Sequence, residues 1–281
     1  MRLRDLAFVV LAAGLLWAGT ARASSEWINM TYTGDDPTRT GVVNKAGPGQ
    51  TPYDVYVGQS NFQIDLHSGA PLYGTDYNGA TTPSLGPASR IVTDSAAANY
   101  TISGYCIDTH HWISKNTHAT FSIVSLAEAL KAFYPDDTQA TLRGTKAADI
   151  SRLWKQHIVD SHDTTTADGA AAFAASVWEI VNETTGTYNV SWDSTAKGSF
   201  YVHPDGGLTW DHTANTWLGN LGSGDAADIM ALVPTDLSIQ RFAVLVPAVV
   251  PEPFTMLTAF LAIGSLGVYV RKHTTRTVKA A

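Results

Sequence analysis

Residues 100–108 read YTISGYCID, and this stretch decides how the rest of the chain is interpreted. Apolar and polar residues alternate along it, which is typical of a β-strand whose successive side chains point to opposite faces. The face that holds the cysteine contains Ile102, Gly104, Cys106 and Asp108. A glycine two residues before the cysteine predicts a place where another element approaches the strand closely. The opposite face contains Tyr105 and Ile107.

A helical pattern follows this strand. Residues 168–182 read DGAAAFAASVWEIVN, with apolar residues at three- and four-residue spacing. This spacing predicts a helix with one buried stripe, formed by Phe173, Ala174, Val177, Trp178 and Val181. Two further helices are predicted at 126–134 and at 147–162. Trp154 and Trp178 lie on the apolar stripes and are therefore predicted to be core residues.

Strand patterns flank the helices on both sides. From residue 24 to about 103, the chain reads as short strands between Gly and Pro turns, with a long loop at 68–90. After the helices, strands are predicted at 187–192, 199–202, 228–233 and 240–246, and a short helical piece at 215–221. The order predicts an α+β fold, a β-sandwich or barrel with a helical insertion at about 120–185.

Two of these segments carry a family resemblance. The strand motif Tyr105-Cys106-Ile107-Asp108 and helix 168–182 together resemble the thioester domains of bacterial surface proteins. The resemblance implies a bond between a cysteine sulfur and the side chain of a glutamine on the helix. This sequence has Ala174 where that glutamine is expected, so we expect a degenerate, unreactive site. The alternative is a covalent adhesin whose thioester joins Cys106 to another glutamine, such as Gln139, Gln156 or Gln240.

The chain has one cysteine, so Cys106 cannot form an internal disulfide. It is either a buried small apolar residue, a partner in a disulfide between chains, or a functional thiol. A Cys-dependent hydrolase is a further alternative, with His110 as the base on the cysteine's face of the strand. The sequence around Cys106 lacks the local signatures of such enzymes, and the leading expectation is that the protein is not an enzyme.

Both ends of the chain predict export. Residues 1–23 contain Arg2 and Arg4, an apolar segment and the small-residue site Ala21-Arg22-Ala23, as in a cleaved signal peptide. At the other end, Val250-Pro251-Glu252-Pro253 precedes the uncharged span 254–270. This span is just long enough to be a transmembrane helix. The basic segment 271–276, with Arg271, Lys272 and Arg276, is expected to stay in the cytoplasm.

The order of these C-terminal parts resembles the PEP-CTERM sorting tail of Gram-negative, biofilm-forming bacteria, over residues 250–276. The resemblance implies that an exosortase-type membrane protease cuts near Pro-Glu-Pro. The ectodomain, residues 24–249, would stay briefly in the inner membrane and then pass to the cell surface or extracellular matrix. We therefore expect a non-catalytic matrix or adhesion protein that binds exopolysaccharide.

Composition limits the partners. The chain has 18 basic and 25 acidic residues, and removing 1–23 and 254–281 leaves 11 basic and 24 acidic residues, a net charge of −13. Such an acidic ectodomain is not expected to bind nucleic acid. His110, His111 and His118 lie close in sequence but lack a metal-binding spacing, so neither a metal nor a cofactor is expected. Trp210 and Trp217 are the predicted sugar-stacking residues.

Overall fold

The computed structural model describes residues 26–45, 53–67, 70–71, 73–74, 91, 99–184, 187–192 and 200–246. The predicted signal peptide, the sorting tail with its span 254–270, and most of the loop at 68–90 lie outside these residues. The chain divides into two compact units, Met1–Pro247 and Ala248–Ala281. Among the described residues, no helix combines the length and apolarity needed to cross a bilayer.

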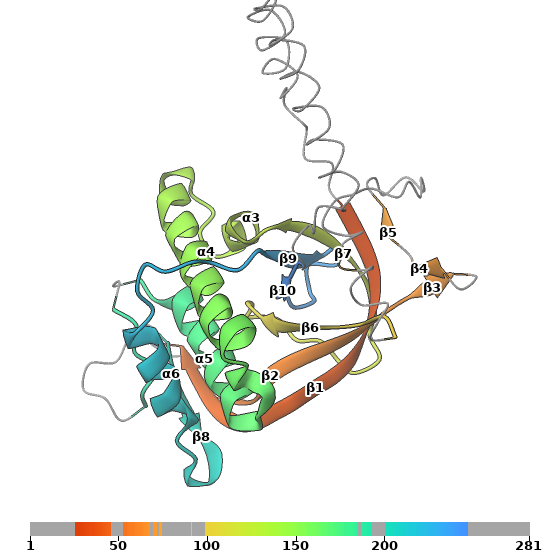
Figure 1. Ribbon diagram of the computed structural model, residues 1–281. Helices are drawn as coiled ribbons and strands as arrows, with labels where there is room; N and C mark the ends of the chain where they lie inside the picture. The colour runs from red at the N-terminus through yellow and green to blue at the C-terminus, as the bar shows by residue number, and fades with distance from the viewer. Residues whose placement is uncertain are drawn as a thin grey trace, which may run out of the picture. The chain divides into compact units, whose positions relative to one another are not determined.

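The described part is α+β and is built on a closed antiparallel β-barrel of six strands (Figure 1). In order around the barrel, these are β1 (Glu26–Lys45), β2 (Tyr53–Ile64), β6 (Thr101–Cys106), β10 (Phe242–Leu245), β9 (Ile229–Pro234) and β7 (His118–Ser125). Pairing of β7 with β1 closes the barrel. Two short strands also pair with β1. Strand β5 (Tyr73–Gly74) pairs near its start, and β8 (Phe200–Pro204) pairs near its end. The pair β3 (Leu66–His67) and β4 (Ala70–Pro71) forms a separate small sheet.

Aromatic side chains fill the barrel. Phe62 is fully buried and lies 4.8 Å from Phe242 and 5.9 Å from Phe121 between ring centroids. Tyr32 packs on the same ring at 5.6 Å. Rings at these separations and tilted angles pack favourably beyond their buried area. The predicted close approach occurs at Gly104, where a Cβ atom would lie 2.7 Å from the carbonyl oxygen of Ala243 on β10.

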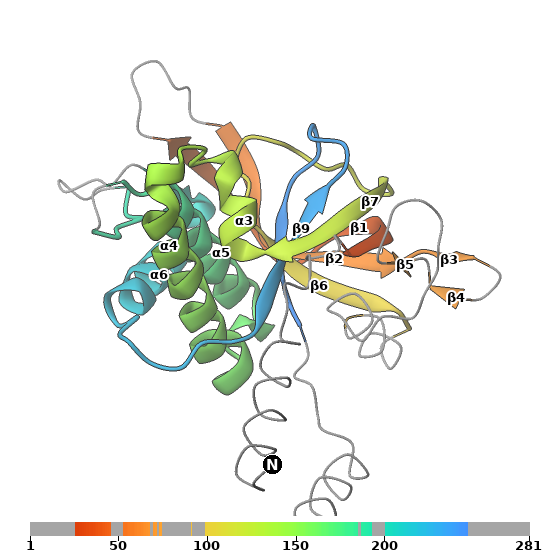
Figure 2. The same ribbon diagram turned by 90° about the horizontal axis from the view of Figure 1, so that it is seen from above.

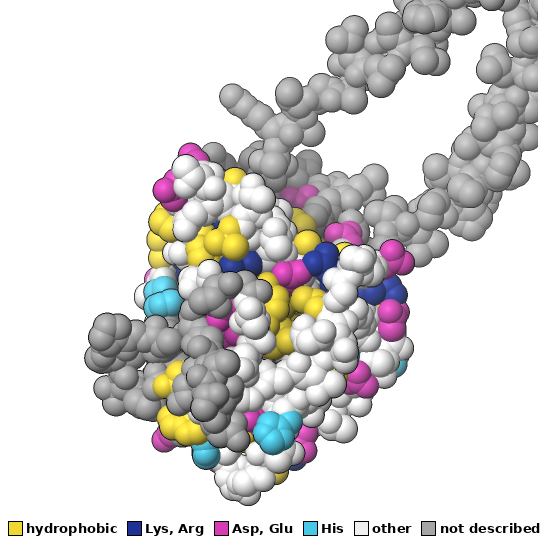
Figure 3. All heavy atoms as spheres, turned by 90° about the vertical axis from the view of Figure 1, so that its left-hand side faces the viewer, with side chains coloured by type: hydrophobic (Ala, Val, Ile, Leu, Met, Phe, Trp, Pro, Cys, Tyr) yellow, Lys and Arg dark blue, Asp and Glu magenta, His cyan; other side chains and the backbone are white. Residues whose placement is uncertain are grey.

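The helices lie on one side of the barrel in two perpendicular views (Figures 1 and 2). They comprise α3 (Leu126–Ala129), α4 (Ala140–Trp154), α5 (Ala167–Asn182) and α6 (Trp210–Gly219), with a π-helical turn at Lys155–Asp160. From this side, the described surface is mostly polar, with apolar side chains in small groups between charged ones (Figure 3).

Helix α5 is the centre of the helical layer, and every residue from Gly169 to Val181 is buried. Thr166 caps its first turn by accepting a hydrogen bond from the Gly169 amide at 3.1 Å. Only glycine fits at 169, because a Cβ atom there would lie 1.9 Å from the Asp163 carbonyl oxygen. The alanine-rich sequence favours a helix and lets α5 pack closely against its neighbours.

The outer face of β6 joins the helices to the barrel. Tyr105 packs on Phe173 of α5 at 4.5 Å and on Trp154 of α4 at 5.6 Å. Trp154 is 2% exposed, and Trp178 is 5% exposed. The predicted alternation of β6 and the predicted core positions of both tryptophans are therefore confirmed.

Several predicted boundaries are wrong. Residues 26–45 form one 20-residue strand, because β1 continues through register shifts near Gly34 and Pro37 instead of ending in a turn. Residues 118–125 are strand β7, so the helical insertion begins at Leu126 rather than about 120. Residues 187–192 form no ladder and make a single bridge, from Ser191 to Val202.

The helix predicted at 147–162 also differs from the structure. It begins earlier, at Ala140, and its regular part ends at Trp154, where the backbone widens into the π-helical turn. The helix predicted at 215–221 begins earlier as well, at Trp210. The segments 140–146 and 210–214, where these helices begin, do not have an apolar stripe strong enough to predict a helix from the sequence.

Candidate functional site: a pocket at the barrel mouth

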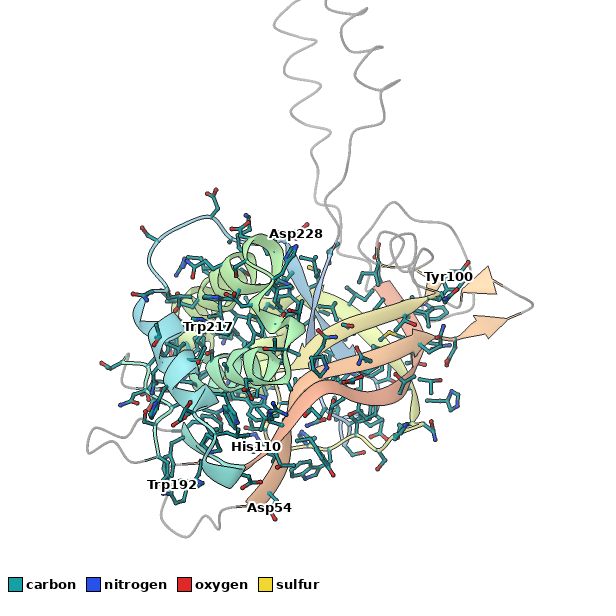
Figure 4. The ribbon with its side chains drawn as sticks, turned by 60° about the horizontal axis from the view of Figure 1, so that its bottom comes forward. Asp54, Tyr100, His110, Trp192, Trp217 and Asp228 are labelled. Atoms are coloured by element: carbon teal, nitrogen blue, oxygen red, sulfur yellow. The ribbon has the colours of Figure 1, made fainter. Side chains whose placement is uncertain are left out.

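A cavity of about 370 Å³ opens at the end of the barrel where β6 ends; we call it the mouth pocket. It is lined by Tyr32, Gly34, Asp35, Thr38, Tyr56, Gly58, Ser60, Cys106, Trp112, Ile113, Lys115, Trp178 and Gln240. Figure 4 shows His110, just beyond β6, at the end of the barrel opposite Tyr100, just before β6. The pocket thus lies where the barrel meets the helices, a common position for ligand sites.

Strand register brings the polar floor together. Asp35 on β1 pairs with Ser60 on β2, and Ser60 pairs with Gly104 on β6. The Ser60 hydroxyl donates to Asp35 Oδ1 at 2.7 Å, and the Tyr32 hydroxyl also hydrogen-bonds to this carboxyl. Burial raises the pKa of Asp35 above its ordinary value, although both hydrogen bonds oppose that shift.

Cys106 lies in the floor of the pocket with 6% of its surface exposed. Its thiol donates to the Asp108 carbonyl oxygen at 2.9 Å, and its sulfur accepts from the Asp108 amide at 3.2 Å. Burial, followed by the nearby Asp108 carboxylate, raises the pKa of this thiol far above its ordinary value. A reactive cysteine needs the opposite shift, since the thiolate is the nucleophile. The surroundings of Cys106 therefore favour the protonated thiol over the thiolate.

Asp108 anchors the wall beside the thiol. Its side chain is fully buried and accepts from Arg241 at 2.5 Å and from the His110 amide at 2.9 Å. His111 Nδ1 lies 2.8 Å from Asp108 Oδ2. This network holds the loop after β6 against β10, and a buried carboxylate is tolerable there because its hydrogen bonds are satisfied.

The two residues of the predicted degenerate thioester position, Cys106 and Ala174, do not both line the mouth pocket. Trp178 of α5, rather than Ala174, lines the mouth pocket with Cys106, and Ala174 is fully buried in the core. Gln240 also lines the pocket, and its side-chain amide lies 3.4 Å from the Asp108 carbonyl oxygen that accepts from Cys106. Gln156, another of the candidate glutamines, donates to the Leu221 carbonyl instead.

In the described structure, the hydrogen bonds of Cys106 go to Asp108 and not to His110, the predicted base. Its ring stacks on Phe133 at 5.9 Å, and its side chain is 54% exposed. His118 contacts Thr31 at 2.6 Å and lies at the start of β7, whereas His110 and His111 lie in the loop after β6. In the described part of the chain, no group of three or more His, Cys, Asp or Glu residues is arranged to hold a metal ion.

The rim of the pocket carries the exposed aromatic residues. Tyr56 is 68% exposed and Trp112 is 56% exposed. The prediction that Trp210 stacks on sugars is wrong, because this side chain is 2% exposed and packs against Gly41. Trp217 stacks on His157 at 4.0 Å and lies on α6, away from this pocket (Figure 4).

Sequence reasoning missed the contributions of Asp35, Ser60, Tyr56 and Trp112 to this site. In the sequence, Asp35 is the first residue of the acidic pair Asp35-Asp36, and no neighbouring residue indicates a pocket. The sequence does contain a signal for the two aromatic residues: Tyr56 stands at an outward-facing position of a strand and Trp112 in a loop, where polar side chains are usual.

A second polar cluster holds the C-terminal end of α5. Lys146 donates to the carbonyl oxygens of Ile180 and of Glu183, the latter at 2.5 Å. Glu179 accepts from the Asn189 amide at 2.7 Å. Burial lowers the pKa of Lys146 to about 8 and raises that of Glu179 to about 8. The cluster fixes the segment after α5 and is not part of the mouth pocket.

Comparisons with protein-family models, with curated proteins and with solved structures gave no match to this chain.

Proposed function

We propose that this chain is a non-enzymatic surface or extracellular-matrix protein whose mouth pocket binds saccharide units of an exopolysaccharide. The observation that carries the proposal is the pair of exposed aromatic residues, Tyr56 and Trp112, beside a polar-floored cavity. A pyranose ring has apolar C–H faces that pack on aromatic rings, while its hydroxyl groups need hydrogen-bonding partners. Asp35, Ser60 and Thr38 supply such partners in the pocket.

The chemistry of the lining supports a binding site over a hydrolytic one. Most glycosidases use two carboxyl groups that flank the scissile bond. Asp35 is the only acidic residue in the described lining. The neighbouring thiol of Cys106 has a raised pKa and is directed to a backbone carbonyl. Neither group is arranged as an activated nucleophile.

Binding can be measured by titrating the full-length protein with a panel of neutral and acidic oligosaccharides and following Trp fluorescence or heat. The variants Tyr56→Ala and Trp112→Ala should each weaken binding by roughly tenfold, because a desolvated aromatic contact is worth about 1 kcal/mol or more. Leu237→Ala is the matched control, since Leu237 is 62% exposed and does not line the pocket. Equal affinity in all four proteins would refute the assignment of the site.

We propose in addition that the sorting tail delivers the ectodomain, as the resemblance to PEP-CTERM tails implies. The span 254–270 would hold the chain in the inner membrane, with Arg271, Lys272 and Arg276 in the cytoplasm, until an exosortase-type protease cuts near Val250-Pro251-Glu252-Pro253. Replacing Pro251, Glu252 and Pro253 with alanine should leave full-length protein in the membrane fraction. Mass spectrometry of wild type from the surface or medium should find a chain without the tail. An uncut wild-type chain in the membrane would contradict the proposal.

A covalent adhesin is the second candidate, and the presence of Cys106 and Gln240 in one pocket favours it. The thiol would add to the Gln240 amide carbon, a C–S bond would replace the C–N bond, and the thiol proton would leave with the nitrogen as ammonia. Intact mass spectrometry separates the two candidates. The non-covalent proposal expects no loss of ammonia and no methylamine adduct, whereas a thioester shows both, and Gln240→Glu abolishes them.

A further inference from the structure

We infer that the mouth pocket takes an acidic saccharide, a uronate whose carboxylate lies against Lys115 while its hydroxyl groups meet Asp35. This inference rests on the proposed function and specifies its ligand. Both charged side chains of the described lining are then used, each by a different part of one sugar.

Lys115 is the only cation that lines the described pocket. Its side chain lies along Gly34, where a Cβ atom would be 3.9 Å from both Cδ and Cε. No Asp or Glu carboxylate in the described structure comes within ion-pair distance of its amine. By contrast, Lys131 pairs with Glu128 at 2.8 Å. In a segment (residues 24–253) of net charge −13, an unpaired cation at a cavity leaves a place for an anionic ligand.

A second donor is buried in the same pocket. The Trp178 indole Nε1–H has no hydrogen-bond partner of good geometry in the described structure, and the residue is only 5% exposed. A buried N–H without a partner costs free energy, which a ligand oxygen would recover. The indole also lies close enough to Cys106 to favour its thiolate, but this contact does not satisfy the N–H.

The acceptor differs from Lys115 in its exposure. Asp35 is half-buried at the floor between Tyr32 and Ser60, whereas Lys115 is exposed at the rim. A neutral hexose would use the floor and leave the cation unpaired. A uronate offers hydroxyl groups to the floor, its ring to Tyr56 and Trp112, and its carboxylate to the rim.

The test uses short oligomers of glucuronate, galacturonate and mannuronate, each compared with its own methyl ester. The ester keeps the ring and hydroxyl groups and removes the charge. Short oligomers limit the general repulsion between long polyanions and an acidic protein. At low salt, at least one free acid should bind the full-length protein roughly threefold to fivefold more tightly than its ester, as expected for one partly exposed ion pair. Added salt should reduce this difference.

Two variants identify the cation. Lys115→Gln should remove the preference for the acid over its ester, and Lys115→Arg should retain it. Lys131→Gln is the matched control and should behave as wild type, because Lys131 is an exposed lysine outside the pocket. Esters that bind as tightly as acids, or a preference that survives Lys115→Gln, would overturn the inference but leave saccharide binding intact. Absence of binding by every acid, ester and neutral sugar would defeat the proposed function itself.

Discussion

Replacing Gly104 with alanine should destabilise the barrel, although the same substitution at Gly144 should stabilise the protein. A Cβ atom at Gly104 would lie 2.7 Å from the Ala243 carbonyl oxygen and 2.9 Å from Val244 Cγ1. The first contact is with backbone, so relief requires β6 and β10 to separate at the floor of the mouth pocket. Overpacking of this kind costs about 1–3 kcal/mol.

Gly144 provides the matched comparison. It lies in α4, and a Cβ atom there would meet nothing within 4 Å. Alanine at that position removes only the entropic disadvantage of glycine in a helix, so the free energy of unfolding should rise by about 0.5–1 kcal/mol. The free energies of unfolding of the two variants should therefore differ by about 1.5–4 kcal/mol.

Urea unfolding followed by Trp fluorescence measures both changes, provided that the free energy of unfolding falls with urea concentration at the same slope in each protein. The sheet pairing of β6 with β10 can be checked independently by amide exchange at Val244. A Gly104→Ala protein as stable as wild type would refute the argument that this glycine exists to admit β10. A destabilised Gly144→Ala protein would refute the estimate of helix propensity.

Three further predictions concern buried side chains. Glu179→Gln should flatten the pH dependence of stability. In the wild type, folding raises the pKa of Glu179 from 4.5 to about 8, so the folded protein holds this proton more tightly than the unfolded chain. The resulting stability is fully present below pH 4.5 and is lost as the pH rises towards 8, by at most about 1.4 kcal/mol per pH unit. Urea titrations at pH 5, 6 and 7 measure this loss, and an equal loss in the wild type and in Glu179→Gln would contradict the prediction. Phe62→Ala should cost about 3–5 kcal/mol, because the ring is fully buried among three other aromatic rings, and calorimetry should show the loss. Iodoacetamide at pH 7.5 should modify Cys106 slowly in the folded protein and rapidly in urea, because burial raises the pKa of the thiol; rapid modification of the folded chain, seen by mass spectrometry, would favour a functional thiol.

Much of the architecture follows from local periodicity. The alternation at 100–108 predicts β6, and the three- and four-residue stripe at 168–182 predicts α5, including the core positions of Phe173 and Trp178. These predictions succeed because a strand with two different faces and a helix with one buried stripe leave their period in the sequence. The α+β class follows from the same patterns.

The long first strand and β7 did not follow from the sequence. Turn-forming residues such as Gly34 and Pro37 indicate a break, but the bulges at these positions keep β1 paired with β2 on both sides. Residues 118–125 have a weak alternation, and their strand exists because β1 and β9 pair with both of its edges. Such pairing is a tertiary effect that local propensity does not contain.

The sequence by itself determined the single thiol and the acidic charge. It predicts export signals at both ends, and the resemblance to thioester domains predicts a missing glutamine at Ala174. Only the tertiary structure decided what surrounds Cys106. The register of β1 against β2 brings Asp35 and Ser60 to one floor, and the loop after β6 adds Trp112 and Lys115 to its rim. The reason is physical: a pocket depends on the register of strands that are distant in sequence, and register is set by the closure of the whole barrel rather than by any one segment.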